Sequence, residues 1–240
     1  MTKRRLNWAA LLNARDLGGL PTTAGGTRFR AVVRSDTLRR LREAGRAALL
    51  AYGVRTIVDL RSHTEVRAAP SPLRDHAGYR NLPFIDEAGL AALASFDTAA
   101  DTYLWQLESQ AVRVAAVLRA VAEAPPGGVL VHCVAGKDRT GMVVALLLTV
   151  AGVAREAVAE DYGLSAEGLA LMLEEALAAE PDSGQWARLR RAYTARPEAM
   201  ARLLADLDSR YGGVDGYLER AGLGAETLRR LRRRLTSPPA

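Results

Sequence analysis

The chain has 240 residues, of which 33 are Lys or Arg and 27 are Asp or Glu, so its formal net charge is +6 at pH 7. Hydrophobic residues make up 49% and charged residues 25%, which is the mix of a globular protein with a sizeable core. This composition excludes a disordered or fibrous chain. The single cysteine, Cys133, excludes a disulfide framework within the chain.

The first third of the sequence predicts alternating strands and helices, with Gly and Pro at the boundaries. In chain order we first expect a loop over 13–20, a strand over 27–34 and a short helix that carries Leu38 and Leu41 and is capped by Ser35, Asp36 or Thr37. A helix over 43–52 that ends at Gly53 follows, and then a strand over 54–60. The last elements of this part are a loop at Pro70 and Pro72 and a short strand over 79–84.

Helical periodicity dominates the rest of the chain. One helix is expected over 101–124, and Pro125 to Gly128 end it. Its broad apolar face is predicted to comprise Leu104, Leu107, Val112, Ala115, Val117, Leu118 and Val121. A short buried strand over 129–131 and a loop of about ten residues then precede an apolar helix that begins near Thr140. From Arg155 onward the pattern is helical, with breaks at 181–184, 212–213 and 222–224.

These elements predict an α/β protein with a strand-rich front half and a helical back half. The length favours a single domain over 1–240, with a sheet-containing core at about 10–155 and a helical part at 156–240.

Targeting and transmembrane segments are not expected. The apolar stretch 8–12 is too short for the core of a signal peptide, and Arg15 and Asp16 follow it closely. The longest uncharged run, 140–154, is shorter than the roughly 20 residues of a spanning helix. The expected location is the cytoplasm, which a single free cysteine fits, and secretion without a signal peptide stays open.

Arginines cluster between residues 229 and 234. Such a run can bind nucleic acid or anionic lipid, but Leu228, Leu231 and Leu235 at helical spacing favour a solvated helix face opposite a packed one. No aromatic residues alternate with the arginines to stack on bases, so no nucleic-acid partner is expected.

The segment 131–141, V-H-C-V-A-G-K-D-R-T-G, lies between a predicted buried strand and a predicted buried helix. Its backbone N–H groups therefore gather at a helix N-terminus, which is a binding site for anions. Gly136 permits a tight backbone, Arg139 offers a planar fork for two phosphate oxygens, and Lys137 adds a second cation to the rim. A nucleotide-binding P-loop is excluded, because Val131 and Asp138 stand where that motif needs Gly and Ser or Thr.

Cys133 begins this loop, where the helix N-terminus and nearby cations favour its thiolate. A thiolate beneath a phosphate cradle can attack phosphorus, while Arg139 stabilises the equatorial oxygens of the transferring group. Thr140 is expected to donate a hydrogen bond to Cys133, and Asp138 or another carboxylate to supply a proton. This two-step route needs no metal and no organic cofactor.

Four further segments share a pattern with one enzyme family: N-A-R-D-L-G-G at 13–19, V-R-S-D at 33–36, T-I-V-D-L-R-S at 56–62 and Y-G-G-V-D-G-Y-L at 211–218. Together with 132–141, they show that the chain resembles the Cys-dependent protein tyrosine and dual-specificity phosphatases, whose signature is H-C-x5-R-[S/T]. It resembles most the bacterial branch that includes the mycobacterial tyrosine phosphatase B.

This resemblance implies a tyrosine-phosphatase-like fold with a central, mostly parallel sheet flanked by helices. It also implies hydrolysis of phosphomonoesters through a phospho-cysteine. Carried over residue by residue, Cys133 is the nucleophile and Arg139 binds the phosphoryl group. The residues expected to bind substrate around them are Val134, Ala135, Gly136, Lys137 and Thr140.

The resemblance leaves alternatives for the general acid. We expect Asp138, which lies within the signature, with Asp59 and Asp86 as alternatives. If Asp59 is not the acid, it caps a strand end or pairs with Arg61. If Asp86 is not the acid, it is a solvated loop carboxylate. Arg15 and Asp16 resemble residues that pack near the pocket, either as an ion pair or in contact with ligand.

The expected activity is hydrolysis of protein phosphotyrosine with relaxed specificity. Lys137 either suits a substrate with a second phosphate, such as a phosphoinositide, or only strengthens the cradle. Residues 88–96 form either a lid over the pocket or a packed helix. A non-catalytic phosphate-binding module is the third hypothesis, which the presence of both Cys133 and Arg139 disfavours.

Overall fold

The computed structural model describes residues 4–23, 25–96 and 98–236. Its central sheet has the strand order β1-β4-β7-β5-β6, in which β4, β7, β5 and β6 run parallel and β1 runs antiparallel to β4. The strands are β1 (Arg15–Asp16), β4 (Val32–Ser35), β5 (Val54–Asp59), β6 (Tyr79–Asn81) and β7 (Gly128–His132), and β2 (Pro21–Thr22) pairs with β3 (Gly25–Gly26) in a separate hairpin. The predicted mostly parallel α/β sheet is confirmed.

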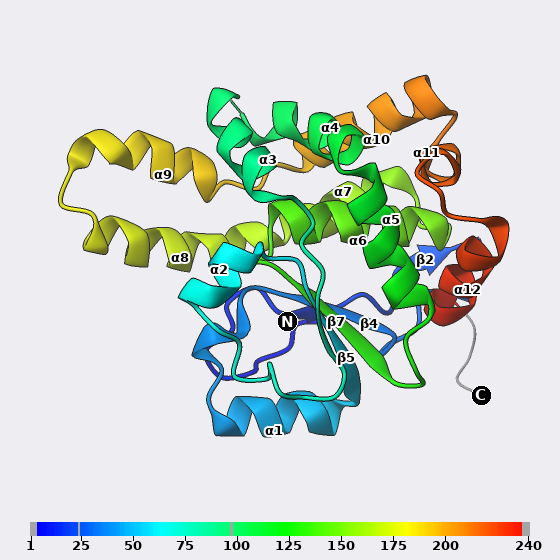
Figure 1. Cartoon of the computed structure of the whole chain (residues 1–240), viewed down its shortest axis with the longest axis horizontal. Helices are drawn as coiled ribbons and strands as arrows, with labels where there is room; N and C mark the ends of the chain where they lie inside the picture. The colour runs from blue at the N-terminus through cyan, green and yellow to red at the C-terminus, as the bar shows by residue number, and fades with distance from the viewer. Residues whose placement is uncertain (1–3, 24, 97, 237–240) are drawn as a thin grey trace.

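Helices cover both faces of this sheet (Figure 1). Their bounds are η1 (Leu38–Arg40), α1 (Glu43–Tyr52), α2 (His63–Ala68), α3 (Glu87–Ala92), η2 (Leu93–Ser95), α4 (Ala99–Ser109), α5 (Ala111–Ala122), α6 (Asp138–Val150), α7 (Arg155–Gly163), α8 (Ser165–Ala179), η3 (Ser183–Gln185), α9 (Trp186–Ala192), α10 (Pro197–Tyr211), α11 (Val214–Arg220) and α12 (Ala225–Thr236).

The alternation of side chains along the strands divides the core in two. In β7, Val129 and Val131 belong to one hydrophobic cluster and Leu130 to the other. The first cluster packs the sheet against α4–α7 and α10–α12, and the second packs it against η1, α1 and the N-terminal segment. Because β7 is buried over its whole length, the loop that follows it starts from a fixed position in the middle of the sheet.

The helix predicted over 101–124 is divided in the structure. Gln110 has non-helical angles between α4 and α5, and the packed face of α5 begins at Val114. Val112 lies on the opposite side of α5 and is 80% exposed, so the prediction that it belongs to the apolar face is wrong.

Three other boundaries differ from the prediction. The strand expected over 27–34 is confined to β4, because the chain turns at Arg30, which has a φ of 63°. The strand expected over 79–84 ends at Asn81. The apolar helix starts at Asp138 rather than Thr140, so the loop after β7 is shorter than expected.

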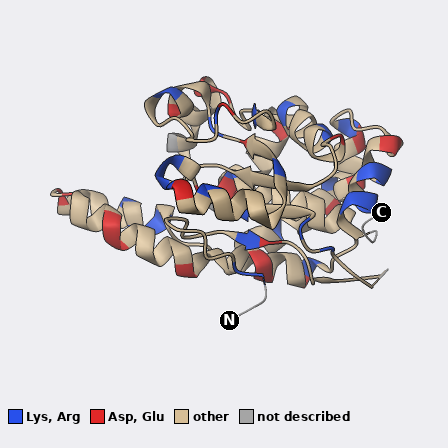
Figure 2. Cartoon of the chain, turned by 90° about the horizontal axis from the view of Figure 1, so that it is seen from below, with Lys and Arg blue, Asp and Glu red and all other residues tan. Residues whose placement is uncertain are grey.

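The helical back half has the predicted breaks, with further ones at Leu164 and between α9 and α10. Helices α8 and α9 form a hairpin that projects from the body (Figure 1). In α12, Leu228, Leu231 and Leu235 are buried. Arg229, Arg230 and Arg233 are exposed and pair with Glu226, in the basic surface near the C-terminus (Figure 2). Arg232 and Arg234 are half-buried, and Arg234 donates to the carbonyl oxygens of Ala124 and Gly127. The predicted solvated basic face is therefore present.

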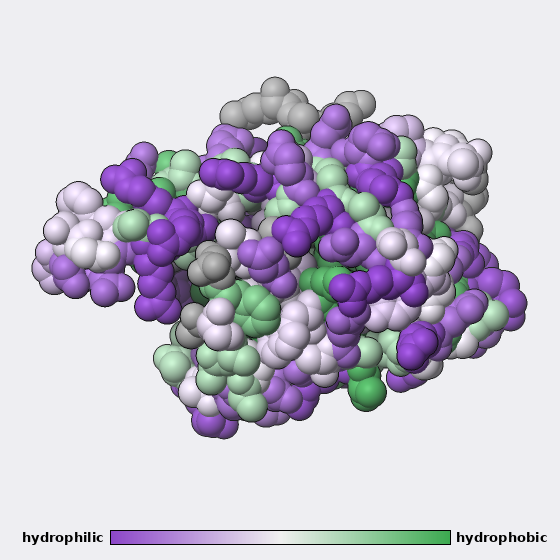
Figure 3. All heavy atoms as spheres, turned by 90° about the horizontal axis from the view of Figure 1, so that it is seen from above, coloured by the Kyte–Doolittle hydropathy of each residue, from purple (hydrophilic) through white to green (hydrophobic). Residues whose placement is uncertain are grey.

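Seen from above, the surface is mainly hydrophilic, with its hydrophobic residues in small separate groups (Figure 3). Among the helices of the described ranges, none has the length and apolar composition needed to span a membrane.

Candidate active site

The loop Cys133–Lys137 joins the end of β7 to the start of α6. Loops at the carboxyl ends of parallel strands are the usual ligand sites of α/β sheets. Gly136 has a φ of 67°, and a Cβ atom there would lie 2.5 Å from the carbonyl oxygen of Ser35. This position therefore requires glycine, as the sequence predicted.

The carbonyl groups of the loop are held from behind. Asn13 Nδ2 donates to the carbonyl oxygens of Ala135 (3.0 Å) and Gly136 (3.2 Å), and Arg34 Nη2 donates to that of Gly136 (2.7 Å). The Val134 carbonyl accepts from the amide of Thr37. Within the described ranges, no group accepts a hydrogen bond from the amides of residues 134–137. With its carbonyls fixed on one side, the loop leaves these donors for an anion at the N-terminus of α6.

These contacts explain why two of the N-terminal motifs lie close to the loop. Asn13 and Arg15 come from 13–19, and Arg34 comes from 33–36. Arg15 Nη1 donates to Asn13 Oδ1 at 2.7 Å, and Arg15 and Arg34 both pair with the buried Asp161 of α7. Arg15 does not line the cavity described below, so of the two possibilities for this residue the structure has the ion pair.

Asp161 is the centre of a buried charge cluster. Burial opposes its ionisation, but Arg15, Arg34 and Arg4 hold the pKa of its carboxyl well below the ordinary range. Burial and the neighbouring Arg34 lower the pKa of Arg15 to about 10. The ionised cluster joins the N-terminal segment, β4 and α7 directly behind the loop.

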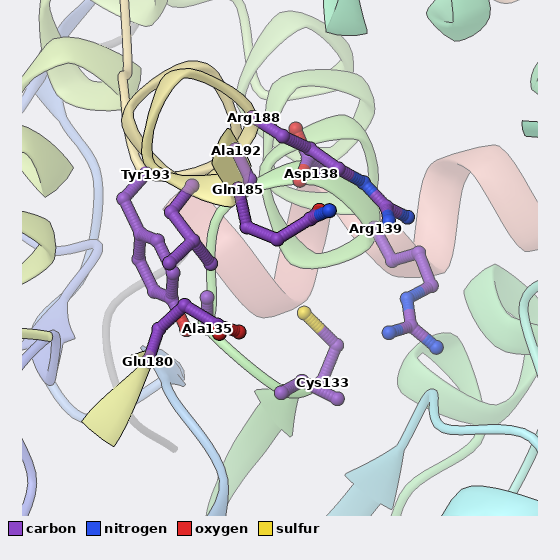
Figure 4. Close-up of a pocket in the computed structure, with 11 residues that line it drawn as sticks. Cys133, Ala135, Asp138, Arg139, Glu180, Gln185, Arg188, Ala192 and Tyr193 are labelled. Carbon is purple, nitrogen blue, oxygen red and sulfur yellow. The ribbon is translucent and has the colours of Figure 1, made fainter. Parts of the chain in front are cut away.

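Cys133 is 3% exposed, and its sulfur points into the space between Arg139 and the residues of α9 (Figure 4). Behind it, His132 Nδ1 lies 3.2 Å from the Cys133 carbonyl oxygen, and His132 Nε2 lies 3.5 Å from Asp59 Oδ2. Burial lowers the pKa of His132, a shift that the nearby Asp59 opposes, and the ring supports the nucleophile loop from behind.

Arg139 lies in the first turn of α6 and makes a bidentate ion pair with Glu65, with distances of 2.6 Å and 2.8 Å. Although burial disfavours its charge, the hydrogen bonds that it donates to Glu65 raise the pKa of Arg139 above its ordinary value. Two of the five guanidinium N–H groups are engaged, which leaves the others for a phosphoryl group.

Glu65 belongs to the site through its ion pair with Arg139, and the sequence did not predict it. Its backbone amide donates to Ser62 Oγ and its carboxylate accepts from the Ser62 amide, which forms a capping box at the start of α2. The pattern S-x-x-E at 62–65 is a sequence signal for this cap, but nothing in it indicates that the same carboxylate reaches Arg139.

Lys137 is not on the rim of the loop, contrary to the prediction. Its side chain is 1% exposed, and Nζ donates to the carbonyl oxygens of Ala192 (2.5 Å) and Thr194 (3.3 Å). It also lies 3.3 Å from Asp138 Oδ1. Lys137 thus ties the loop to the end of α9.

The hydrogen bond predicted from Thr140 to Cys133 is not formed. Thr140 is fully buried, and its hydroxyl has no hydrogen-bond partner among the described residues.

The three carboxylates considered as general acids have different surroundings. Asp138 lines the cavity, and its side chain is 38% exposed. Asp59 is fully buried and bound bidentately by Arg61 (2.7 Å at the closest), with a further hydrogen bond from Tyr79. Although burial opposes ionisation, its neighbours His132 and Arg61 lower the pKa of Asp59. Asp86 caps α3 by accepting from the Gly89 amide at 2.8 Å.

A cavity of about 410 Å³ lies above the loop. One wall is the predicted site, with Cys133, Val134, Ala135, Asp138 and Arg139. The opposite wall comes from the turn of the α8–α9 hairpin and from α9 itself, with Glu180, Gln185, Arg188, Leu189, Ala192 and Tyr193 (Figure 4).

No sequence pattern indicates this second wall, because 186–192 has only the pattern of an ordinary helix. The described part of 88–96 contributes no residue to the cavity, and Leu90 and Leu93 pack against the core. Within the described ranges, no three His, Cys, Asp or Glu side chains are arranged to hold a metal ion.

Comparison with known proteins connects this geometry to one family. A sequence model described as "Tyrosine phosphatase family" matches residues 6–237. A tyrosine-protein phosphatase of Nostoc commune is 33% identical over 219 residues, which covers 85% of this chain and 74% of the relative. The triple specificity protein phosphatase PtpB of Mycobacterium tuberculosis is 31% identical, over 88% of this chain and 92% of the relative. A putative tyrosine-protein phosphatase of Cupriavidus necator is 29% identical, over 90% and 83%.

Proposed function

This chain belongs to the tyrosine phosphatase family, and on that premise we propose that Cys133, Arg139 and Asp138 carry its chemistry. It is a protein-tyrosine phosphatase, a hydrolase of phosphomonoesters, and the reaction of the family passes through a phospho-cysteine. The observation that carries the assignment of residues is the single cavity wall that holds the thiol, the paired arginine and a carboxylate.

In the first step, Cys133 Sγ attacks phosphorus, so that the S–P bond forms as the ester P–O bond breaks. Asp138 gives its proton to the departing oxygen. Negative charge accumulates on the equatorial oxygens of the phosphoryl group. These oxygens accept hydrogen bonds from the guanidinium of Arg139 and from the free amides of Val134, Ala135, Gly136 and Lys137.

In the second step, a water molecule attacks phosphorus and gives a proton to the Asp138 carboxylate, and the S–P bond breaks to release phosphate and the thiolate. We assign Thr140 to this step. Its buried hydroxyl has no hydrogen-bond partner among the described residues, and we propose that it donates to the sulfur only as the thiolate departs.

Asp138 is supported over the two alternatives by its surroundings. Asp59 is fully buried in its pair with Arg61, which keeps it ionised and away from substrate. Asp86 is occupied as the cap of α3 and does not line the cavity.

For substrates, we propose phosphotyrosine in proteins together with phosphoserine and phosphothreonine. The relaxed specificity is supported by the similarity to a phosphatase named for triple specificity. A phosphoinositide is the alternative substrate, and its second phosphate would need a cationic side chain in the cavity wall. Lys137 is buried against Ala192 and Thr194, whereas Arg188 lines the cavity and no described carboxylate pairs with it. Arg188 is therefore the candidate for that contact.

We further propose that 1–240 act as one phosphatase domain, in which the sheet core of about 10–155 supports the helical part at 156–240. Strands β4, β5 and β7 share one hydrophobic cluster with α10–α12, which supports this view. We retain the cytoplasm as the proposed compartment, because a reactive single thiol needs reducing surroundings.

The test is phosphate release from p-nitrophenyl phosphate in reducing, metal-free buffer by the wild type and by Cys133→Ser. We expect turnover by the wild type only, and trapping of ³²P on its cysteine by rapid acid quench. Equal turnover by the two proteins would overturn the assignment of Cys133. If neither protein turns over but both bind a phosphotyrosine peptide, the non-catalytic phosphate-binding module replaces it.

The same assay on phosphotyrosine, phosphoserine and phosphothreonine peptides and on a short-chain phosphoinositide ranks the substrates. A phosphoinositide preference that Arg188→Ala removes would favour the alternative.

A further inference from the structure

Two buried tyrosines lie behind the proposed general acid. Tyr103 of α4 donates a hydrogen bond from its hydroxyl to Asp138 Oδ1 at 2.5 Å, and its hydroxyl lies 2.6 Å from that of Tyr162 of α7. Tyr103 is 0% and Tyr162 is 2% exposed, and their rings meet edge to face with centroids 6.2 Å apart. Helices α4, α6 and α7 lie next to one another above the sheet (Figure 1).

The direction of this chain of hydroxyl groups follows from its protons. Burial raises the pKa of Tyr103 and of Tyr162 above the ordinary range, so both phenols keep their protons. A phenol has one proton to donate. Since Tyr103 uses its one proton in the hydrogen bond to Asp138, we infer that Tyr162 donates the hydrogen bond between the two hydroxyls.

The two oxygens of Asp138 have unequal surroundings. Tyr103 and the Lys137 ammonium both lie at Oδ1, at 2.5 Å and 3.3 Å. No described residue donates a hydrogen bond to Oδ2. When the carboxyl group is protonated, its own proton is disfavoured at Oδ1, where the Tyr103 hydroxyl donates and the Lys137 ammonium lies, so we place it on Oδ2.

We propose that Tyr103 is a positioning residue for proton transfer, which holds Asp138 by Oδ1 so that Oδ2 carries the proton given to the leaving group. Tyr162 acts one step further away by fixing the orientation of the Tyr103 hydroxyl. This inference rests on the proposed function, specifically on Asp138 as the general acid.

The Oδ2–H bond breaks as the ester P–O bond breaks, the proton passes to the ester oxygen, and the electron pair of the O–H bond remains on Asp138. The carboxylate is then stabilised at Oδ1 by Tyr103 and Lys137. In the second step, Oδ2 takes the proton of the attacking water, which restores the acid.

The test uses the dependence of kcat/KM on the leaving group, because an acid matters most when the departing oxygen is a poor leaving group. The substrates are phenyl phosphate, with a poor leaving group, and 2,4-dinitrophenyl phosphate, with a good one. We expect Tyr103→Phe to lower kcat/KM for phenyl phosphate by about tenfold and for the dinitrophenyl ester by less than about twofold. Tyr162→Phe changes the same ratio in the same direction by a smaller factor.

Tyr217→Phe is the matched control. Tyr217 is equally buried and donates to the Leu107 carbonyl oxygen at 2.7 Å, but it does not line the cavity. It loses a comparable hydrogen bond, and both of its kcat/KM values should stay at the wild-type level. Thermal unfolding of each variant shows whether any change in activity follows a loss of folded protein.

Asp138→Asn tests the assignment of the general acid independently of the role of Tyr103. It should lower kcat/KM for phenyl phosphate by about 10²-fold or more and spare the dinitrophenyl ester. If it lowers both substrates equally, the assignment of Asp138 as the acid fails, and this inference fails with it. If Asp138→Asn behaves as expected but Tyr103→Phe lowers both substrates equally or neither, the acid stands and the positioning role of Tyr103 is wrong.

Discussion

The two walls of the cavity are supported differently. The loop of residues 133–137 is fixed from behind by the buried side chains of Asn13 and Arg34 and by the amide of Thr37, which precedes η1. In the facing hairpin, α9 has no buried residue, and the buried residues of α8 all lie near its start.

This difference indicates that the two walls have different functions in substrate binding. The buried wall must present the same donors to every phosphoryl group, so its geometry is set by the fold before substrate binds. The exposed wall contacts what surrounds the phosphate, and its side chains can adapt or vary. We therefore expect changes behind the loop to affect all substrates alike and changes in the hairpin to affect substrates selectively.

The largest effect is expected for Arg139→Lys. A lysine keeps the charge but loses both the fork that grips phosphate and the bidentate pair with Glu65. We expect kcat/KM to fall by about 10³-fold on p-nitrophenyl phosphate and on phosphopeptides alike, measured by steady-state kinetics. A loss confined to peptides would contradict the division between the walls.

The buried charge cluster behind the loop is expected to dominate stability. Asp161→Asn leaves Arg4, Arg15 and Arg34 without their carboxylate, so the free energy of unfolding in urea at pH 7 should fall by about 3–5 kcal/mol.

The pH dependence of that loss has a defined sign. The folded-state pKa of Asp161 lies below its unfolded value, so its contribution is complete above about pH 4 and is lost as the pH falls toward the folded-state pKa. The difference in stability between wild type and variant should thus be constant from pH 7 to pH 5 and shrink below pH 4. A difference that grows on acidification would show that the cluster does not stabilise the fold through Asp161.

Glu65→Gln tests how precisely Arg139 must be held. The amide keeps the shape but weakens the bidentate pair, and a misplaced guanidinium should lower kcat/KM by about 10²-fold on all substrates. Glu87→Gln is the control. Glu87 lies on α3 and accepts a hydrogen bond from the amide of Thr64, which neighbours Glu65 in α2, but Glu87 makes no contact with Arg139. Equal activities of the two variants would exclude a positioning role for Glu65.

The smallest effect is expected on the hairpin. Arg188→Ala should lower kcat/KM by about two- to fivefold for a phosphotyrosine peptide with acidic flanking residues, as expected for an exposed ion pair. Its effect on the same peptide with neutral flanks should be negligible. Arg190→Ala serves as control, since Arg190 lies on α9 outside the cavity lining. Equal losses on the two peptides would remove Arg188 as a specificity residue.

The sequence predicted best what local patterns determine. Helix α1 has the predicted bounds 43–52 because Gly53 ends it in a left-handed conformation. The strand, loop and helix around Cys133 were recognised because an apolar strand, a glycine and an apolar helix are all local signals. The resemblance of the whole chain to one family then supplied the fold class.

What the sequence could not predict depends on contacts between distant segments. The turn at Arg30 is stabilised by the Arg30 amide, which donates to Asp16 Oδ2. No sequence pattern near residue 30 predicts this turn. The pair of Glu65 with Arg139 and the burial of Lys137 against Ala192 likewise join residues far apart in the chain. The same holds for the hairpin wall, which becomes part of the site only through tertiary packing.

The most direct measurement compares one residue from each wall on the same small substrate. Asn13→Ala and Arg188→Ala are assayed with p-nitrophenyl phosphate, with inorganic phosphate as competitive inhibitor and circular dichroism to verify folding. We predict that Asn13→Ala raises the inhibition constant for phosphate about tenfold, because the loop carbonyls lose a donor that orients the anion-binding amides, whereas Arg188→Ala changes it by less than about twofold. A larger change for Arg188→Ala than for Asn13→Ala would contradict the account, because the phosphate site would then depend on the exposed hairpin rather than on the buried support of the loop.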